Sequence, residues 1–224
     1  RLVRNASPEV VDKVEENLRY LPGVMLEVQP VRNYPNKGLA VHALGYVGEI
    51  SDYEISQGAY SELKAGDIIG KFGLENYYDS YLRGEDGSYR EEVDVAGRVV
   101  QIMDKVDPKP GQGLVLTIDA KLQRIAEEAV DRQLKAIGAR GCALVALDPN
   151  NGEVKALVSR PGFDPNWFVN GISEKNWKYL NTDPFHPMTD KVIAGEYPPG
   201  STFKIVTGSA ALEEKKVTPN EPVS

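Results

Sequence analysis

Two prolines and two glycines fall close together near the middle of the chain, at Pro108, Pro110, Gly111 and Gly113. Proline lacks the backbone donor that helices and central strands need, and glycine inside such elements costs conformational entropy. No regular element is expected to run through this stretch, which therefore has the character of a linker. With 224 residues, the chain is long enough for one large or two small domains with hydrophobic cores. We expect one domain over residues 1–110 and a second over residues 111–224.

The first of these domains carries signals for both helices and strands. Ser7 followed by Pro8 marks a helix start, and apolar residues at helical spacing continue to a stop at Pro22. Alternating apolar residues over 24–28 then indicate a strand. Further along we expect a short helix capped at Ser51 or Asp52, another helix over residues 76–82, and a β-hairpin that turns at Ala96 and Gly97.

The second domain begins with a predicted strand over residues 114–118 and a long helix. Asp119 is a suitable N-cap for this helix, and Gly138 is a suitable stop. Apolar runs around a turn cluster then predict an antiparallel hairpin of residues 142–147 and 154–158. Helices and antiparallel strands together favour an α+β fold. The apolar face expected for the helix consists of Leu122, Ile125, Ala126, Ala129, Val130, Leu134 and Ile137.

Candidate chemistry lies near the C-terminal end, in the sequence Tyr197-Pro198-Pro199-Gly200-Ser201-Thr202-Phe203-Lys204. The Pro-Pro-Gly turn places Ser201 at the start of a helix, where unpaired N–H groups favour developing negative charge. Residues three apart share one helix face, so the Lys204 amine can reach the Ser201 hydroxyl and take its proton. Such a base has to be partly neutral, which requires burial or a neighbouring cation. Taken alone, the pair also fits an N-cap serine and a solvated lysine.

This octet resembles the active-site motif of class B penicillin-binding proteins, and its Pro-Pro pair resembles the elongation-type penicillin-binding protein 2 branch. The resemblance covers most of the chain. One departure is Asp190-Lys191-Val192, where much of the family has Asn-Arg-Ala. Similar segments elsewhere are Tyr34-Pro35, residues 42–48, Gly73-Leu74-Glu75, Leu82-Arg83-Gly84, residues 147–159 and Asp164-Pro165-Asn166.

What the resemblance implies is a non-catalytic N-terminal pedestal domain of the dimerisation type, followed by an incomplete transpeptidase domain of α/β architecture. The implied activity is that of a peptidoglycan D,D-transpeptidase of the cell-elongation machinery. Ser201 would be the nucleophile that forms an acyl-enzyme, and Lys204 the general base. Stem peptides of peptidoglycan would be the substrates, β-lactam antibiotics would acylate the same serine, and no cofactor would be needed.

The resemblance also implies partners and a location. A SEDS-type glycosyltransferase and other proteins of the elongation complex would bind the protein. A single-pass anchor, absent from this chain, would hold it in the inner (cytoplasmic) membrane with its domains facing the periplasm. In agreement, no stretch of the sequence approaches the roughly 20 apolar residues of a membrane span.

Two alternatives to an active transpeptidase stay open. The family's Ser-x-Asn and Lys-Thr-Gly motifs do not follow Ser201 here, so we expect this chain alone to be inactive. That absence favours, for this chain, a non-catalytic scaffold that recruits cell-wall synthesis partners, and an active enzyme for its longer parent. A β-lactamase or β-lactam sensor shares Ser-x-x-Lys as well, but the long N-terminal domain argues against it.

Other charged residues have ordinary structural explanations. A net charge of −7 argues against nucleic acid as a partner. His42 and His186 lack further ligands at metal-binding spacing, so no zinc site is expected and His42 is expected to be a packed or capping residue. Glu127-Glu128 is interpreted as a solvated stretch of a helix. Asp183, His186 and Asp190 are interpreted as solvated or turn-forming residues rather than catalytic partners of Ser201.

Overall fold

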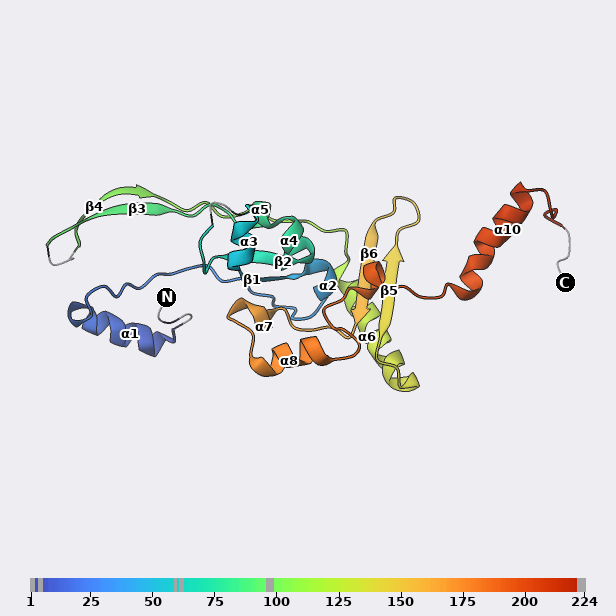
Figure 1. Ribbon diagram of the computed structural model, residues 1–224, viewed down its shortest axis with the longest axis horizontal. Helices are drawn as coiled ribbons and strands as arrows, with labels where there is room; N and C mark the ends of the chain where they lie inside the picture. The colour runs from blue at the N-terminus through green and yellow to red at the C-terminus, as the bar shows by residue number, and fades with distance from the viewer. Residues whose placement is uncertain (1–2, 4–5, 59, 61–62, 96–98, 221–224) are drawn as a thin grey trace. The chain divides into compact units, whose positions relative to one another are not determined.

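The computed structural model describes residue 3 and residues 6–58, 60, 63–95 and 99–220. Helices and antiparallel two-stranded sheets both occur along the chain, and the predicted α+β fold class is confirmed (Figure 1). The chain forms two compact units, Arg1–Ile193 and Ala194–Ser224. The first unit contains residues on both sides of the boundary predicted between residues 110 and 111, and that boundary stays a prediction.

The N-terminal segment contains one helix and a long irregular stretch. Helix α1 (Pro8–Asn17) begins where Ser7 and Pro8 predict, and its last turn tightens into a 3-10 helix over Leu18–Tyr20. The strand expected over residues 24–28 is wrong, because these residues have no regular secondary structure. A strand needs a hydrogen-bonded neighbour, and Val28 is instead fully exposed.

A small antiparallel sheet follows. Strands β1 (Tyr46–Glu49) and β2 (Ile68–Phe72) pair with each other. Helix α2 (Val41–Leu44) leads into β1 through Gly45, which has a φ of +85°. A Cβ atom on Gly45 would lie 1.7 Å from the Phe72 carbonyl oxygen, so only glycine fits there.

Short helices flank this sheet. Helix α3 (Asp52–Ser56) has the predicted cap, in which Ser51 and Glu54 satisfy each other's backbone N–H groups. The single helix expected over residues 76–82 is two helices, α4 (Gly73–Tyr77) and α5 (Asp79–Leu82), which meet at Tyr78.

The predicted hairpin is present as β3 (Ser88–Val93) and β4 (Val99–Val106), which pair antiparallel. Its expected turn at Ala96 and Gly97 lies outside the described residues. The strand expected over residues 114–118 is wrong. This segment instead reaches β6 (Val154–Arg160) through the Thr117 hydroxyl, which donates to the Val154 carbonyl oxygen at 2.9 Å.

Helix α6 (Ala120–Ile137) has the predicted ends. The Asp119 carboxylate accepts from the backbone N–H groups of Lys121 and Leu122, and Gly138 ends the helix with a φ of +68°. Strands β5 (Cys142–Leu147) and β6 confirm the predicted hairpin. The face of α6 differs from the expectation, since its buried residues are Gln123 and Val130. Four residues of the expected apolar face are exposed: Leu122, Ile125, Ala129 and Ile137.

A hydrophobic core joins both halves of the first unit. It is centred on Val41, Phe163 and Leu180, which come from α2, the loop after β6 and α8 (Glu174–Thr182). Aromatic residues from β1 and α7 (Asn166–Val169) pack around this centre, and the ring centroids of Tyr46 and Phe168 are 4.0 Å apart. Residues on either side of the predicted linker therefore bury each other.

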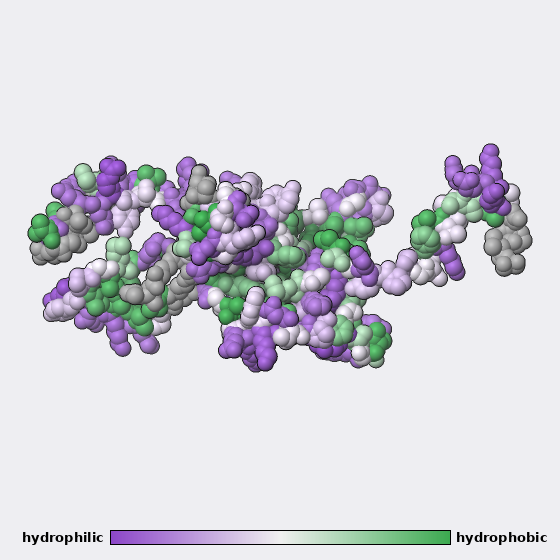
Figure 2. Space-filling model, viewed as in Figure 1, coloured by the Kyte–Doolittle hydropathy of each residue, from purple (hydrophilic) through white to green (hydrophobic). Residues whose placement is uncertain are grey.

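Helix α9 (Lys191–Ala194) comes at the end of the first unit, and the second unit contains α10 (Lys204–Glu213). Hydrophobic side chains lie exposed along α10 (Figure 2). Within the described residues, the large exposed hydrophobic side chains of α10 are Ile205, Val206 and Leu212, and Phe203 is exposed immediately before the helix.

Candidate active site

Ser201 lies in a 3-10 turn that leads directly into α10. Pro198 and Pro199 precede the turn, and Gly200 adopts a left-handed φ of +56°, so the chain reverses immediately before the serine. The turn spans Gly200–Phe203, and the backbone N–H of Lys204 donates to the carbonyl oxygen of Ser201. The predicted helix start is therefore tighter than expected, a 3-10 turn followed by α-helix.

Ser201 and Lys204 are three residues apart in this continuous helical segment. Side chains at positions i and i+3 are nearly eclipsed in a 3-10 helix, so the two residues share one face. Both side chains are exposed within residues 194–220. Among the described residues no hydrogen bond joins the Ser201 hydroxyl to the Lys204 amine. The second unit thus fixes the spacing of the pair and does not itself bury the amine.

The loop before this unit holds the other polar residues considered for catalysis. Asp183 accepts hydrogen bonds from the Phe185 N–H and from Arg140, whose Nη2 lies 2.6 Å from Asp183 Oδ2. Asp190 accepts from the Val192 N–H at 2.9 Å. His186 is exposed. These aspartates act as turn-forming residues, as the sequence predicts for them.

Glu127 is not solvated, although the sequence predicted a solvated residue at this position. Its side chain is only 12% exposed, and one carboxylate oxygen lies 2.9 Å from Arg160 Nη2. The other oxygen accepts from the Ala40 backbone N–H and from the Gln123 amide, both at 2.8 Å. Glu127 therefore connects α6, β6 and the turn before α2. The sequence signal for this contact is the four-residue spacing between Gln123 and Glu127, which places both side chains on one helix face.

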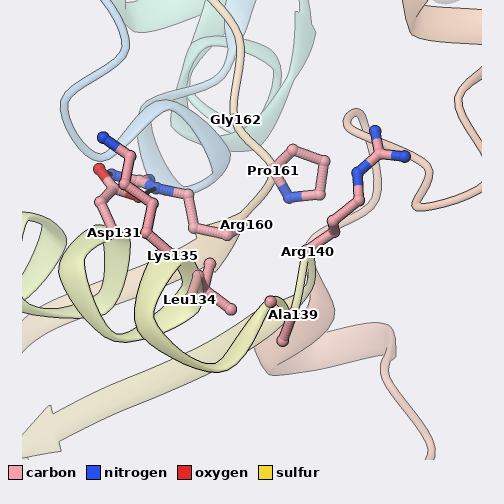
Figure 3. Close-up of a pocket in the computed structure, with 9 residues that line it drawn as sticks. Asp131, Leu134, Lys135, Ala139, Arg140, Arg160, Pro161 and Gly162 are labelled. Atoms are coloured by element: carbon pink, nitrogen blue, oxygen red, sulfur yellow. Dashed lines mark hydrogen bonds and ion pairs between the residues drawn. The ribbon is translucent and has the colours of Figure 1, made fainter.

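A cleft of about 600 Å³ lies at the C-terminal end of α6. Figure 3 shows Arg160 beside Asp131 on one side of Pro161, and Arg140 on the other. Arg160 also binds Glu127, and Arg140 binds Asp183, so the basic side chains are largely neutralised by carboxylates.

Within residues 6–58, 63–95 and 99–220, no group of three His, Cys, Asp or Glu side chains is placed to hold a metal ion. Across the same residues, no helix is both long and apolar enough to cross a membrane.

Family comparisons place the chain in a defined class. The family described as Penicillin-binding Protein dimerisation domain matches residues 1–116, and the family described as Penicillin binding protein transpeptidase domain matches residues 142–224. The chain belongs to the penicillin-binding proteins.

Individual relatives are more specific. The chain is 38% identical to the peptidoglycan D,D-transpeptidase MrdA of Acinetobacter baumannii over 209 residues, which are 93% of this chain and 30% of that protein. It is 36% identical to MrdA of Escherichia coli K12 over 220 residues, which are 96% of this chain and 34% of that protein. The chain thus spans about a third of the length of these relatives.

Solved structures agree with these relatives. A complex of penicillin-binding protein 2 (PBP2) and MreC from Helicobacter pylori matches with a TM-score of 0.78 and 30% identity, covering 98% of this chain and 39% of that chain. Pseudomonas aeruginosa PBP2 in complex with WCK 5153 matches with a TM-score of 0.67 and 39% identity, covering 87% and 38% of the two chains. The predicted resemblance to penicillin-binding protein 2 is confirmed.

Proposed function

We propose that the protein is a peptidoglycan D,D-transpeptidase of the cell-elongation machinery, with Ser201 as its nucleophile and Lys204 as its general base. The observation that carries this proposal is the turn of Gly200–Phe203, which sets Ser201 and Lys204 on one helical face inside a chain of the penicillin-binding family. Residues 1–110 would form the non-catalytic pedestal, and residues 111–224 would belong to the transpeptidase domain.

The reaction consists of two acyl transfers. Lys204, as the neutral amine, takes the Ser201 hydroxyl proton while Ser201 Oγ attacks the carbonyl carbon of the penultimate D-alanine in a stem peptide. The peptide C–N bond breaks, the terminal D-alanine leaves with a proton on its amine, and an acyl ester on Ser201 remains. An amine from a neighbouring stem peptide then attacks this ester, which forms the cross-link and restores the hydroxyl. The Ser201 backbone N–H would be one donor to the developing oxyanion.

The proposal extends to partners and location. A SEDS-type glycosyltransferase would supply the glycan strands, and a protein like the MreC found in the Helicobacter pylori complex would bind the pedestal. Because peptidoglycan is assembled outside the cytoplasmic membrane, the domains would face the periplasm. β-Lactams would acylate Ser201, since their strained amide resembles the D-alanyl-D-alanine end of a stem peptide.

The proposal is tested by D-alanine release. The full-length protein is incubated with a pentapeptide stem and an amine acceptor, and released D-alanine and the cross-linked product are quantified. Replacing Ser201→Ala or Lys204→Ala should lower the rate by about 10³-fold or more, because each removes a group that takes part in bond formation. Ser209→Ala, on the same helix, is the matched control and should retain activity. Undiminished release by Ser201→Ala would refute the assignment.

A further inference from the structure

His42 is buried at a contact between residues far apart in the sequence. Its side chain, on α2, is 4% exposed, and Nε2 lies 2.7 Å from the carbonyl oxygen of Pro187, which is 145 residues away. A carbonyl oxygen only accepts hydrogen bonds, so the imidazole carries its proton on Nε2 and donates. The ring also meets Phe163 edge-on, with centroids 5.8 Å apart. His42 therefore holds the loop that contains Pro187 against α2.

That loop precedes the unit that carries Ser201. On its other side, the Ser159 hydroxyl of β6 accepts from the Lys191 N–H at 3.0 Å and lies 3.3 Å from the Thr189 carbonyl oxygen, to which it donates. The loop is thus fixed from two directions, by a histidine of the predicted pedestal domain and by a serine of the transpeptidase sheet. Because Lys191–Ala194 runs on from the loop to the second unit, the loop sets where that segment leaves the first unit.

Three charged groups act electrostatically on the His42 imidazole: Asp190, Lys191 and Arg160. Asp190, in the same loop, is 4% exposed, and its Oδ2 has no hydrogen-bond partner among the described residues. Lys191 of α9 and Arg160 of β6 are the positive neighbours. Burial lowers the pKa of His42 below its ordinary value, against the opposing effects of the Pro187 carbonyl and Asp190, and the two cations lower it further. The ring is therefore neutral in the folded protein at neutral pH.

We propose that His42 is a positioning residue that holds residues 187–190 against the pedestal, and that protonation of its ring releases this loop. The neutral ring fits the apolar contact with Phe163, whereas a charged ring would be buried beside Lys191 and Arg160. A group with a lowered folded pKa contributes stability above its ordinary pKa, and this stability is lost as the pH falls through the folded pKa. The contact is closed at neutral pH and opens in acid. Only the link between this loop opening and Ser201 acylation rests on the proposed function.

The His42 signal can be followed by nitrogen NMR of the histidine-labelled full-length protein and assigned by its loss in His42→Gln. Hydrogen exchange of the Lys191 and Val192 amides reports whether the loop is closed. We expect His42 to titrate below the ordinary histidine value, because burial lowers its pKa, and both amides to lose protection in the same pH range. For one proton, the open fraction rises by at most about tenfold per pH unit.

Three variants separate a protonation effect from a merely structural one. His42→Gln keeps an N–H donor but cannot titrate, so amide protection should become independent of pH in this range. In His42→Ala, the Lys191 and Val192 amides should lose protection at every pH. Asp190→Asn should move the loss of amide protection to lower pH, because it removes the negative charge that raises the pKa of His42. His186→Gln is the matched control and should behave like the unsubstituted protein.

Titration of His42 at or above the ordinary histidine value, or unchanged amide protection across the His42 titration, would overturn the proposal. The acylation rate with a penicillin is measured over the same pH range. Loop opening without acylation at any pH would leave the positioning role intact and reject the proposed function. Acylation of Ser201 by a protein whose loop does not respond to pH would support the proposed function and reject the positioning role of His42.

Discussion

Replacing Gln123 by alanine should destabilise the first unit more than any exposed substitution on the same helix. Gln123 is fully buried, its Nε2 lies 2.7 Å from the Leu157 carbonyl oxygen, and its Oε1 accepts from the Leu157 N–H at 2.8 Å. The amide thus pairs with the backbone of β6 as a neighbouring strand would. Gln123→Ala leaves two part-buried backbone groups of Leu157 without these partners; at about 1–3 kcal/mol each, we expect a loss of about 2–6 kcal/mol.

The assay is thermal unfolding of the full-length protein, followed by circular dichroism. For a domain of this size, each kcal/mol lowers Tm by about 2–4 °C. Gln133→Ala is the matched control, because Gln133 is an exposed glutamine on the same helix and alanine is a better helix former. Gln123→Leu keeps the side-chain volume but not the hydrogen bonds, so it should resemble Gln123→Ala. A Gln123→Leu protein as stable as the control would refute the reasoning.

Two further predictions concern carboxylates. Glu127→Gln should cost about 1.5–3 kcal/mol in thermal unfolding, because it removes the charge that faces Arg160, while the exposed Glu128→Gln should change little; equal effects would contradict the account. Burial alone would raise the pKa of Glu54, but hydrogen bonds from Lys71 and Ser51 outweigh it and hold the pKa at about 2. The stability that Glu54 contributes is therefore present above its ordinary value of 4.5 and is lost as the pH falls toward 2. Glu54→Gln should flatten the dependence of Tm on pH in this window, and an unchanged slope would reject the prediction.

The sequence predicted elements whose signals are local. Asp119 and Gly138 bound α6 as expected, and Ser51 caps α3, because a cap depends on residues only a few positions away. The strands expected over residues 24–28 and 114–118 failed for the opposite reason. An alternating pattern becomes a strand only if a distant segment pairs with its backbone. Next to residues 114–118, the Leu157 backbone of β6 is bound by the Gln123 side chain, and Thr117 binds β6 only through its hydroxyl.

The same distinction applies to the candidate site. The spacing of Ser201 and Lys204 and the turn before them could be read from the Pro-Pro-Gly sequence, because backbone restrictions act locally. The Glu127 network could not be read in this way. Glu127 is buried because it pairs with Arg160, and Arg160 lies 33 residues further along the chain. Polar residues at core positions are recognised only once their partners are known.

The central claim, that Ser201 is an acylated nucleophile, is tested most directly by intact mass spectrometry after incubation with a penicillin. We predict that the full-length protein gains the mass of one penicillin and that Ser201→Ala gains none. Ser209→Ala should be labelled like the unsubstituted protein. An adduct of the same yield on Ser201→Ala would contradict the account, because the reacting side chain would then lie elsewhere.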